Sequence, residues 1–115
     1  MRLNFKRIFF LLLIFSIPKC LYAGDLLLGK EKAAIICSAC HGMDGQAVSG
    51  GNSPLTPNIT AQEKEYLLAK LKDYKSAKIN HPQMSLIAQM LSDEDIENVS
   101  EWYSNIKISI ELPLE

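Results

Sequence analysis

Two thiols and an imidazole stand together in the segment ICSACHG, residues 36–42. Cys37 and Cys40 are separated by two residues, and His41 follows directly. This spacing suits three kinds of chemistry: a redox-active dithiol, half of a tetrahedral zinc site, or the covalent attachment of a haem through two thioether bonds. The rest of the chain supplies the means to choose among them.

The sequence around the motif does not support a redox-active dithiol or a zinc site. A zinc site of the ribbon type takes a second pair of Cys or His ligands, and beyond the N-terminal segment the chain adds only His81. A thioredoxin-like dithiol follows a strand in a βαβ unit, whereas the segments around Cys37 are rich in helix formers and show no parallel-sheet pattern. Both interpretations are therefore weak.

Haem attachment uses all three residues of the motif. Two thiols one helical turn apart can each add to a vinyl group of the same porphyrin, and the adjacent imidazole is then held against the iron. The sequence therefore predicts one covalent haem c, bound through Cys37 and Cys40, with His41 as an axial ligand of the iron. A covalent cofactor also suits a short chain, because a small domain builds only a small apolar core.

The first 23 residues have the composition of a secretory signal peptide. A basic head precedes an apolar run over 8–17, and Ala23 places a small residue at the end. As a helix, that run would be about 15 Å long, half of the roughly 30 Å hydrocarbon core of a bilayer. We therefore expect export to the periplasm, cleavage after Ala23, and one domain over 24–115. The alternatives are an uncleaved membrane anchor and a lipoprotein at Cys20, although the lysine before this cysteine fits a lipoprotein signal poorly.

Removal of the leader makes the domain acidic. Four of the twelve basic residues and none of the thirteen acidic ones lie in the first 23 positions, which leaves eight lysines, thirteen carboxylates and a net charge of −5. No arginine remains. Such a surface does not suit nucleic acid, whose phosphates need a basic patch. It favours redox proteins that present a basic face, with membrane contact only through a redox complex or an uncleaved leader.

Helical patterns flank the motif on both sides. A first helix is expected over 24–40, and a loop rich in Gly and Pro follows over 42–59. A second helix is expected to begin near Thr60, because Thr60 and Glu63 have the spacing of a capping box. Its apolar face consists of Leu67, Leu68, Leu71 and Tyr74.

The second half of the chain ends in another capped helix. Residues 77–85 have an irregular pattern, 86–90 suit one helical turn, and Ser92 is placed to cap a last helix with three acidic residues in its first turn. The buried stripe of that helix consists of Ile96, Val99, Trp102, Tyr103 and Ile106. The whole pattern predicts an all-α domain of three or four helices around a long loop.

Four side chains are candidates for the second axial position of the iron. Met43 lies two residues after the haem histidine and cannot reach the opposite face. Met90 directly precedes the last helix, where a methionine more often fills a core. His81 precedes a proline and is expected to be a solvated loop residue, although a second imidazole is conceivable. Met84 lies in irregular chain that can extend across a haem face, and an open position is the remaining alternative.

Residues 29–107 resemble a small bacterial class I cytochrome c with a single haem. The resemblance rests on CSACHGMDG behind a helix with Gly29, on PNITAQEKEYLLAKLKDYK, and on HPQMSLIAQMLSDEDIENVSEWYS. In the family pattern a methionine stands about seven residues before Leu-Ser-acid-acid, and Met84 stands seven residues before Leu91. The resemblance thus implies the class I fold, wrapped around one covalently attached haem, with Met84 as the second axial ligand.

The resemblance also implies two supporting contacts. A loop proline carbonyl accepts the other ring N–H of the haem histidine, and Pro57 is the best match to this position, ahead of Pro54. The first and last helices cross at a small residue packed against an aromatic one, which suggests Gly29 against Trp102 or Tyr103.

A haem iron with His and Met ligands leaves no position for a substrate, so one-electron transfer is the remaining chemistry. The chain shows no nucleophile with an adjacent base, no paired carboxylates and no phosphate loop, so no enzymatic activity is predicted. The expected function is that of a periplasmic electron carrier, which cycles Fe(III)/Fe(II) between redox partners. A ligand-binding or sensory haem protein with an open sixth position and a dithiol oxidoreductase are the competing functions.

Overall fold

The computed structural model describes residues 23–47 and 55–113. Its helices in chain order are α2 (Leu26–Lys32), the π-helical turn η2 (Ala33–Cys37), α3 (Ser38–His41), α4 (Lys64–Lys75), α5 (Met84–Gln89) and α6 (Asp93–Ser104). No strand is present within these residues, which agrees with the expected all-α class. The expected leader up to residue 22, and Pro54, lie outside the described residues. No helix in the described part of the chain is long and apolar enough to cross a bilayer.

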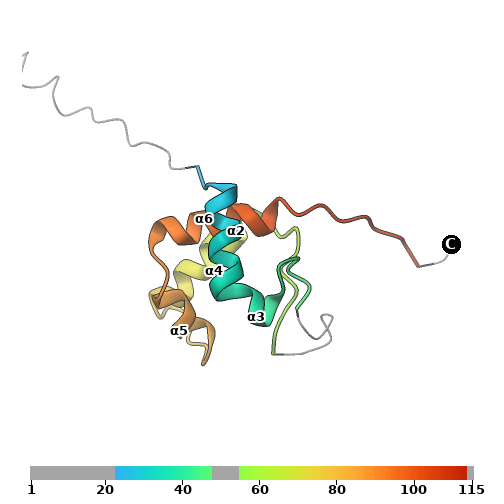
Figure 1. Ribbon diagram of the computed structural model, residues 1–115. Helices are drawn as coiled ribbons and strands as arrows, with labels where there is room; N and C mark the ends of the chain where they lie inside the picture. The colour runs from blue at the N-terminus through green and yellow to red at the C-terminus, as the bar shows by residue number, and fades with distance from the viewer. Residues whose placement is uncertain (1–22, 48–54, 114–115) are drawn as a thin grey trace, which may run out of the picture.

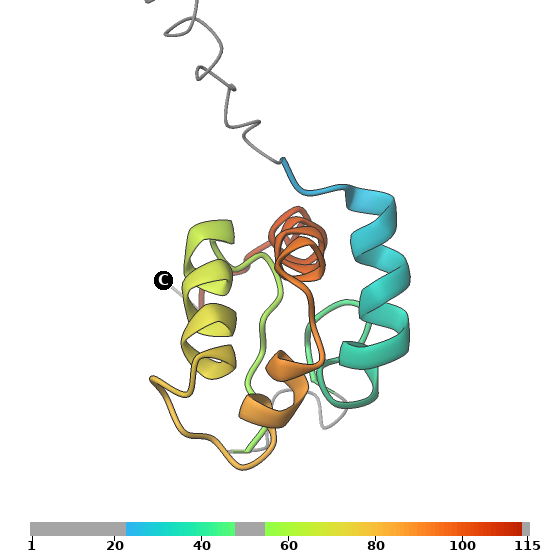
Figure 2. The same cartoon turned by 90° about the vertical axis from the view of Figure 1, so that its left-hand side faces the viewer.

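The last helix, α6, lies between the other long helices. Figure 2 shows α6 end-on between α4 and the continuous helical segment formed by α2, η2 and α3. That segment runs from Leu26 to His41, close to the helix expected over 24–40. Asp25 begins it, because the Asp25 carboxylate accepts hydrogen bonds from two free N–H groups of the first turn, at 2.8 and 2.9 Å. Beyond α6, Ile106 still packs against the helices, and residues 107–113 extend away from them (Figure 1).

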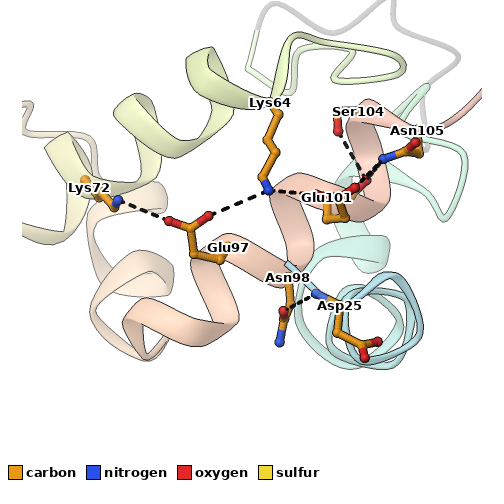
Figure 3. Close-up of polar contacts among 8 residues, drawn as sticks. All are labelled: Asp25, Lys64, Lys72, Glu97, Asn98, Glu101, Ser104 and Asn105. Carbon is orange, nitrogen blue, oxygen red and sulfur yellow. Dashed lines mark hydrogen bonds and ion pairs between the residues drawn. The ribbon is translucent and has the colours of Figure 1, made fainter. Parts of the chain in front are cut away.

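The close approach of α2 to α6 depends on Gly29. A Cβ atom at this position would lie 2.0 Å from the backbone oxygen of Asn98 and 3.1 Å from Cβ of Trp102. The Asn98 side chain adds a hydrogen bond, since its Oδ1 accepts the backbone N–H of Asp25 at 2.7 Å (Figure 3). The expected contact of a small residue with an aromatic one is therefore present, with Trp102 as the aromatic residue.

Helix α4 begins later than its sequence pattern suggests. The expected capping box at Thr60 is wrong, because α4 starts at Lys64 without a side-chain cap. The N–H of Ala61 instead donates to the carbonyl of Tyr103 at 3.0 Å, and the hydroxyl of Thr60 donates to the carbonyl of Asp44. These long-range hydrogen bonds, together with a φ of +52° at Ala61, hold the segment in a turn.

Ion pairs join α4 to α6 (Figure 3). Lys64 Nζ lies 2.7 Å from a carboxylate oxygen of Glu101 and 3.8 Å from one of Glu97, and the other Glu97 oxygen lies 3.5 Å from Lys72 Nζ. The hydrogen bond between Lys64 and Glu101 raises the pKa of the lysine and lowers the pKa of the carboxylate. Because water still reaches these side chains, the pairs contribute little to stability and chiefly orient the two helices.

Helix α6 begins and packs as its sequence pattern indicates. The Ser92 hydroxyl accepts the N–H of Asp95 and the Asp95 carboxylate accepts the N–H of Ser92, both at 2.9 Å, so the capping box is complete. The most buried members of the expected stripe are Ile96, Val99 and Tyr103. Two apolar clusters join the helices, one of Ala33, Leu67 and Tyr103 and the other of Leu68, Leu91 and Ile96.

Candidate functional site

A cavity of about 660 Å³ lies among the helices. Its wall is formed by residues of η2 and α3, of the segment 55–59, of α4, of the segment 81–91 and of α6. The volume is within the range of about 300–1,000 Å³ that is usual for ligand and cofactor sites. The four site residues predicted from the sequence all line this cavity: Cys37, Cys40, His41 and Met84.

The imidazole of His41 is held in one tautomer. His41 is 8% exposed, and its Nδ1 lies 3.0 Å from the carbonyl oxygen of Pro57. Because a carbonyl oxygen only accepts hydrogen bonds, Nδ1 carries the proton and donates it to Pro57. In the neutral ring, Nε2 then has the free lone pair and is available as a metal ligand. Pro57 thus makes the contact that the resemblance implies for a loop proline.

Two aromatic side chains of α6 fix the segment that follows His41. The Tyr103 hydroxyl donates to the carbonyl of Gly42 at 2.9 Å, and Trp102 Nε1 donates to the carbonyl of Met43 at 3.1 Å. Burial raises the pKa of Tyr103, so its hydroxyl remains a donor. Gly42 ends α3 with a φ of +74°, a backbone conformation that favours glycine. A helix far away in the sequence therefore helps to set the position of the His41 backbone.

The two cysteines have different surroundings. Cys37 is half-buried against an apolar cluster, whereas Cys40 is exposed. Burial raises the pKa of the Cys37 thiol to about 11, although Lys32 opposes this change. A redox-active dithiol needs a lowered thiol pKa, because the thiolate is the attacking species. The surroundings of Cys37 therefore do not suit a dithiol oxidoreductase.

Met84 is the methionine that lines the cavity. It is the first residue of α5, which starts before the turn expected over 86–90. Met43 and Met90, although both are within the described residues, are not part of the cavity wall. The expectation that Met90 fills a core is wrong, because its side chain at the end of α5 is 67% exposed.

His81 is not the solvated loop residue that its sequence context suggests. It is half-buried and lines the cavity, and its ring meets the edge of the Tyr74 ring with centroids 5.8 Å apart. Its Nδ1 also accepts hydrogen bonds from the backbone N–H groups of Gln83 and Met84. The expectation was wrong because the proline after His81 indicates an extended or turning backbone and carries no information about the packing of α4 against it.

Sequence reasoning missed several other residues of the cavity wall. Tyr66 and Lys70 line it from α4, with Lys70 Nζ 5.4 Å from the centroid of the Tyr66 ring. Their spacing of four residues, which continues to Tyr74, places all three on one helix face and is the signal that could have found them. Ser100 lines the cavity from α6, and no pattern in the sequence distinguishes this serine from other helical serines.

The donor set and the wall of the cavity fit a haem. Apolar side chains such as Ile36, Leu71 and Val99 surround two thiols, one imidazole and one thioether, which are the groups that attach a haem c and ligate its iron. The Ser100 hydroxyl, in the same wall, is buried and has no hydrogen-bond partner among the residues that the structure describes. A buried hydroxyl without a partner is uncommon in a finished core and indicates that another group belongs beside it.

Comparison with known protein families identifies the group that the cavity holds. The family model for cytochrome c matches residues 27–107. The chain belongs to the cytochrome c family. As a cytochrome c it binds haem c covalently with its iron, and a single haem fits the size of the domain. Its helical structure is the class I cytochrome c fold.

Relatives of this cytochrome c include small proteins and halves of larger ones. Cytochrome c-554(548) of Halomonas halodenitrificans is 41% identical over 86 residues, which cover 72% of this chain and 98% of that protein. Cytochrome c4 of Pseudomonas aeruginosa is 34% identical over 88 residues, 76% of this chain and 41% of that protein. The crystal structure of reduced recombinant cytochrome c4 from Pseudomonas stutzeri matches this structure with a TM-score of 0.65 and 32% sequence identity. The match covers 76% of this chain and 48% of the cytochrome c4 chain. The chain thus spans less than half of its cytochrome c4 relatives, and the family as a whole supports electron transfer through haem.

Proposed function

We propose that the protein is a periplasmic electron carrier and not an enzyme, with haem c attached to Cys37 and Cys40 and its iron ligated by His41 and Met84. One observation carries this proposal: the four side chains line a single cavity, although Met84 comes from α5 and the other three come from η2 and α3. The hydrogen bond from His41 Nδ1 to Pro57 supports it, because this bond leaves Nε2 free for the iron.

The ligand set determines the kind of chemistry. When bound, the haem iron supplies one-electron transfer between Fe(III) and Fe(II). The His41 imidazole and the Met84 thioether would together hold the iron, so an outside molecule would find no free position at the metal. A thioether is a soft, neutral donor, and it raises the reduction potential relative to a second imidazole. The apolar wall around these ligands also limits the access of water.

The leader and the charge of the domain support the proposed location and partners. A signal peptide over 1–23 would deliver residues 24–115 to the periplasm as one domain. That domain would carry a net charge of −5, with eight lysines and thirteen carboxylates. Redox partners with a basic face would be attracted to it, and the attraction would weaken as the salt concentration rises.

Mass spectrometry of the exported protein tests the attachment. The protein is produced in a host that is competent to attach haem c, and the wild type is expected to carry one covalent haem. Cys37→Ser and Cys40→Ser each remove one of the two thioether bonds, so each variant is expected to hold its haem by a single bond. A wild-type polypeptide mass without any adduct would contradict the proposal.

Two methionine variants test the ligation. The ferric wild type is expected to show the weak near-infrared absorption of a thioether–iron bond. Met84→Ala should lose this absorption and lower the reduction potential, whereas Met90→Ala, which changes an exposed methionine at the other end of α5, should keep both. A ferric spectrum that is unchanged in Met84→Ala would instead favour an open sixth position and a ligand-binding or sensory function.

A further inference from the structure

His81 lies in the turn that leads into α5, the helix that carries Met84. The N–H of Ser85 donates to the carbonyl of His81 at 3.1 Å in this turn, and α5 itself begins at Met84 with Gln83 at its N-cap. His81 Nδ1 lies 3.3 Å from the backbone nitrogen of Gln83 and 3.2 Å from that of Met84. These N–H groups stand two and three residues after His81, the spacing at which a capping Ser, Asp or Asn accepts, and we call the two hydrogen bonds the His81 cap.

The chemistry of these contacts defines the tautomer of His81. Backbone N–H groups only donate, so Nδ1 of His81 is unprotonated and accepts. His41 has the opposite arrangement, because its Nδ1 donates to a carbonyl. The backbone partners of the two histidines therefore favour opposite arrangements: Nδ1 donates in His41, whereas Nδ1 accepts in His81.

Further contacts hold the His81 ring and backbone in place. The His81 N–H donates to the hydroxyl of Ser85 at 2.9 Å, and that hydroxyl donates onward to the carbonyl of Ile79 at 3.1 Å. The edge of the ring packs on Tyr74 of α4 at an interplanar angle of 72°. Both neighbours of the imidazole, the α5 backbone and α4, are thus part of the cavity wall.

We propose that His81 is a positioning residue for Met84: its Nδ1 fixes the turn that leads into α5 and thereby keeps the thioether at the cavity wall. This inference rests on the proposed ligation of the iron by Met84. A helix of six residues has little stability of its own, so the cap has a large share in keeping it formed. Without the cap, α5 opens more often and Met84 leaves the iron more often.

Two His81 variants separate the acceptor from the aromatic ring. His81→Phe keeps a ring for the contact with Tyr74 but removes the acceptor, whereas His81→Asn keeps an acceptor at the cap and removes the ring. The probe is imidazole, which binds the ferric iron of the haem-loaded protein only when Met84 is displaced. We expect His81→Phe to bind imidazole about fivefold more tightly than the wild type, the factor that corresponds to loss of a helix cap. His81→Asn is expected to bind it like the wild type.

Each result of this experiment has a distinct meaning. If His81→Phe binds imidazole like the wild type, or if both variants bind it equally tightly, the acceptor does not position Met84 and the inference is overturned. If the wild type lacks the near-infrared thioether absorption, the ligation by Met84 itself is overturned. Amide hydrogen exchange on the wild type provides an independent check should His81→Phe not fold. The amides of Gln83 and Met84 should be protected, and exchange as fast as in an unstructured chain would refute the cap.

Discussion

Gly29→Ala tests the crossing of α2 and α6 on which the position of the haem motif depends. Gly29 lies in α2, and η2 and α3 continue from α2 directly to the cysteines and His41. At most helical positions this substitution would stabilise the protein, because alanine exceeds glycine in helix propensity by about 1 kcal/mol. At Gly29 we expect the opposite sign.

The distances at the crossing show why. The added Cβ would lie 2.0 Å from the backbone oxygen of Asn98 and 2.7 Å from its carbonyl carbon, whereas an unstrained contact needs about 3.5 Å. Because the obstructing atoms are backbone, only a separation of the two helices relieves the clash, and it also strains the 2.7 Å hydrogen bond between Asp25 and Asn98. Overpacking costs about 1–3 kcal/mol. Taking the upper end and subtracting the gain in propensity leaves a net loss of about 2 kcal/mol.

Urea unfolding of the haem-loaded protein measures this loss. We expect a lower midpoint with an unchanged slope, a shift of about 1 M for a slope of about 2 kcal/mol/M. Ala69→Gly, at an exposed position of α4, is the matched control, because it changes helix propensity without a helix crossing. A Gly29→Ala variant as stable as the wild type, or more stable, would refute the argument from close packing.

Two further predictions concern α6. Ser100→Ala should lower the free energy of unfolding of the haem-loaded protein by about 1 kcal/mol, because it removes a buried hydroxyl that has no partner among the described residues and for which the haem supplies the neighbouring group. Thermal unfolding measures this change, and an unchanged or higher stability would mean that the hydroxyl stays unsatisfied in the haem-loaded protein. The hydrogen bond from Lys64 holds the pKa of the Glu101 carboxyl group below its ordinary value of 4.5. The stability that this carboxylate contributes is therefore complete above pH 4.5 and is lost as the pH falls through the lower pKa of the folded state. The difference in stability between the wild type and Glu101→Gln should therefore shrink on acidification below pH 4.5, and a difference that does not depend on pH would refute this account.

Features that depend on neighbouring residues could be predicted from the sequence. The capping box of Ser92 and Asp95 needs only residues three positions apart, and the spacing of Cys37, Cys40 and His41 is itself the haem motif. The stripe of α6 followed from helical periodicity for the same reason. Met84, in contrast, could be chosen among the candidate ligands only by resemblance, because its place in the cavity depends on how α5 packs against α4.

The start of α4 shows what defeats a local pattern. Thr60 and Glu63 have the spacing of a capping box, and an isolated peptide would use it. In the protein, the N–H of Ala61 is taken by the carbonyl of Tyr103, and the Thr60 hydroxyl is taken by the carbonyl of Asp44. Hydrogen-bond partners this distant in the chain come together only after α6 has packed, so a pattern of neighbouring residues cannot predict them.

The same dependence on α6 couples folding of the domain to the haem site. Trp102 packs beside Gly29 and also donates to the carbonyl of Met43, so one side chain contacts both the start of the first helical segment and the loop after His41. Tyr103 donates to the carbonyl of Gly42 in the same loop while its own backbone carbonyl accepts from Ala61, before α4. A change that separates α6 from α2 therefore disturbs the backbone on both sides of His41. For this reason we expect that destabilising the helix crossing will loosen His41 and Met84, the proposed ligands of the iron, before the chain unfolds completely.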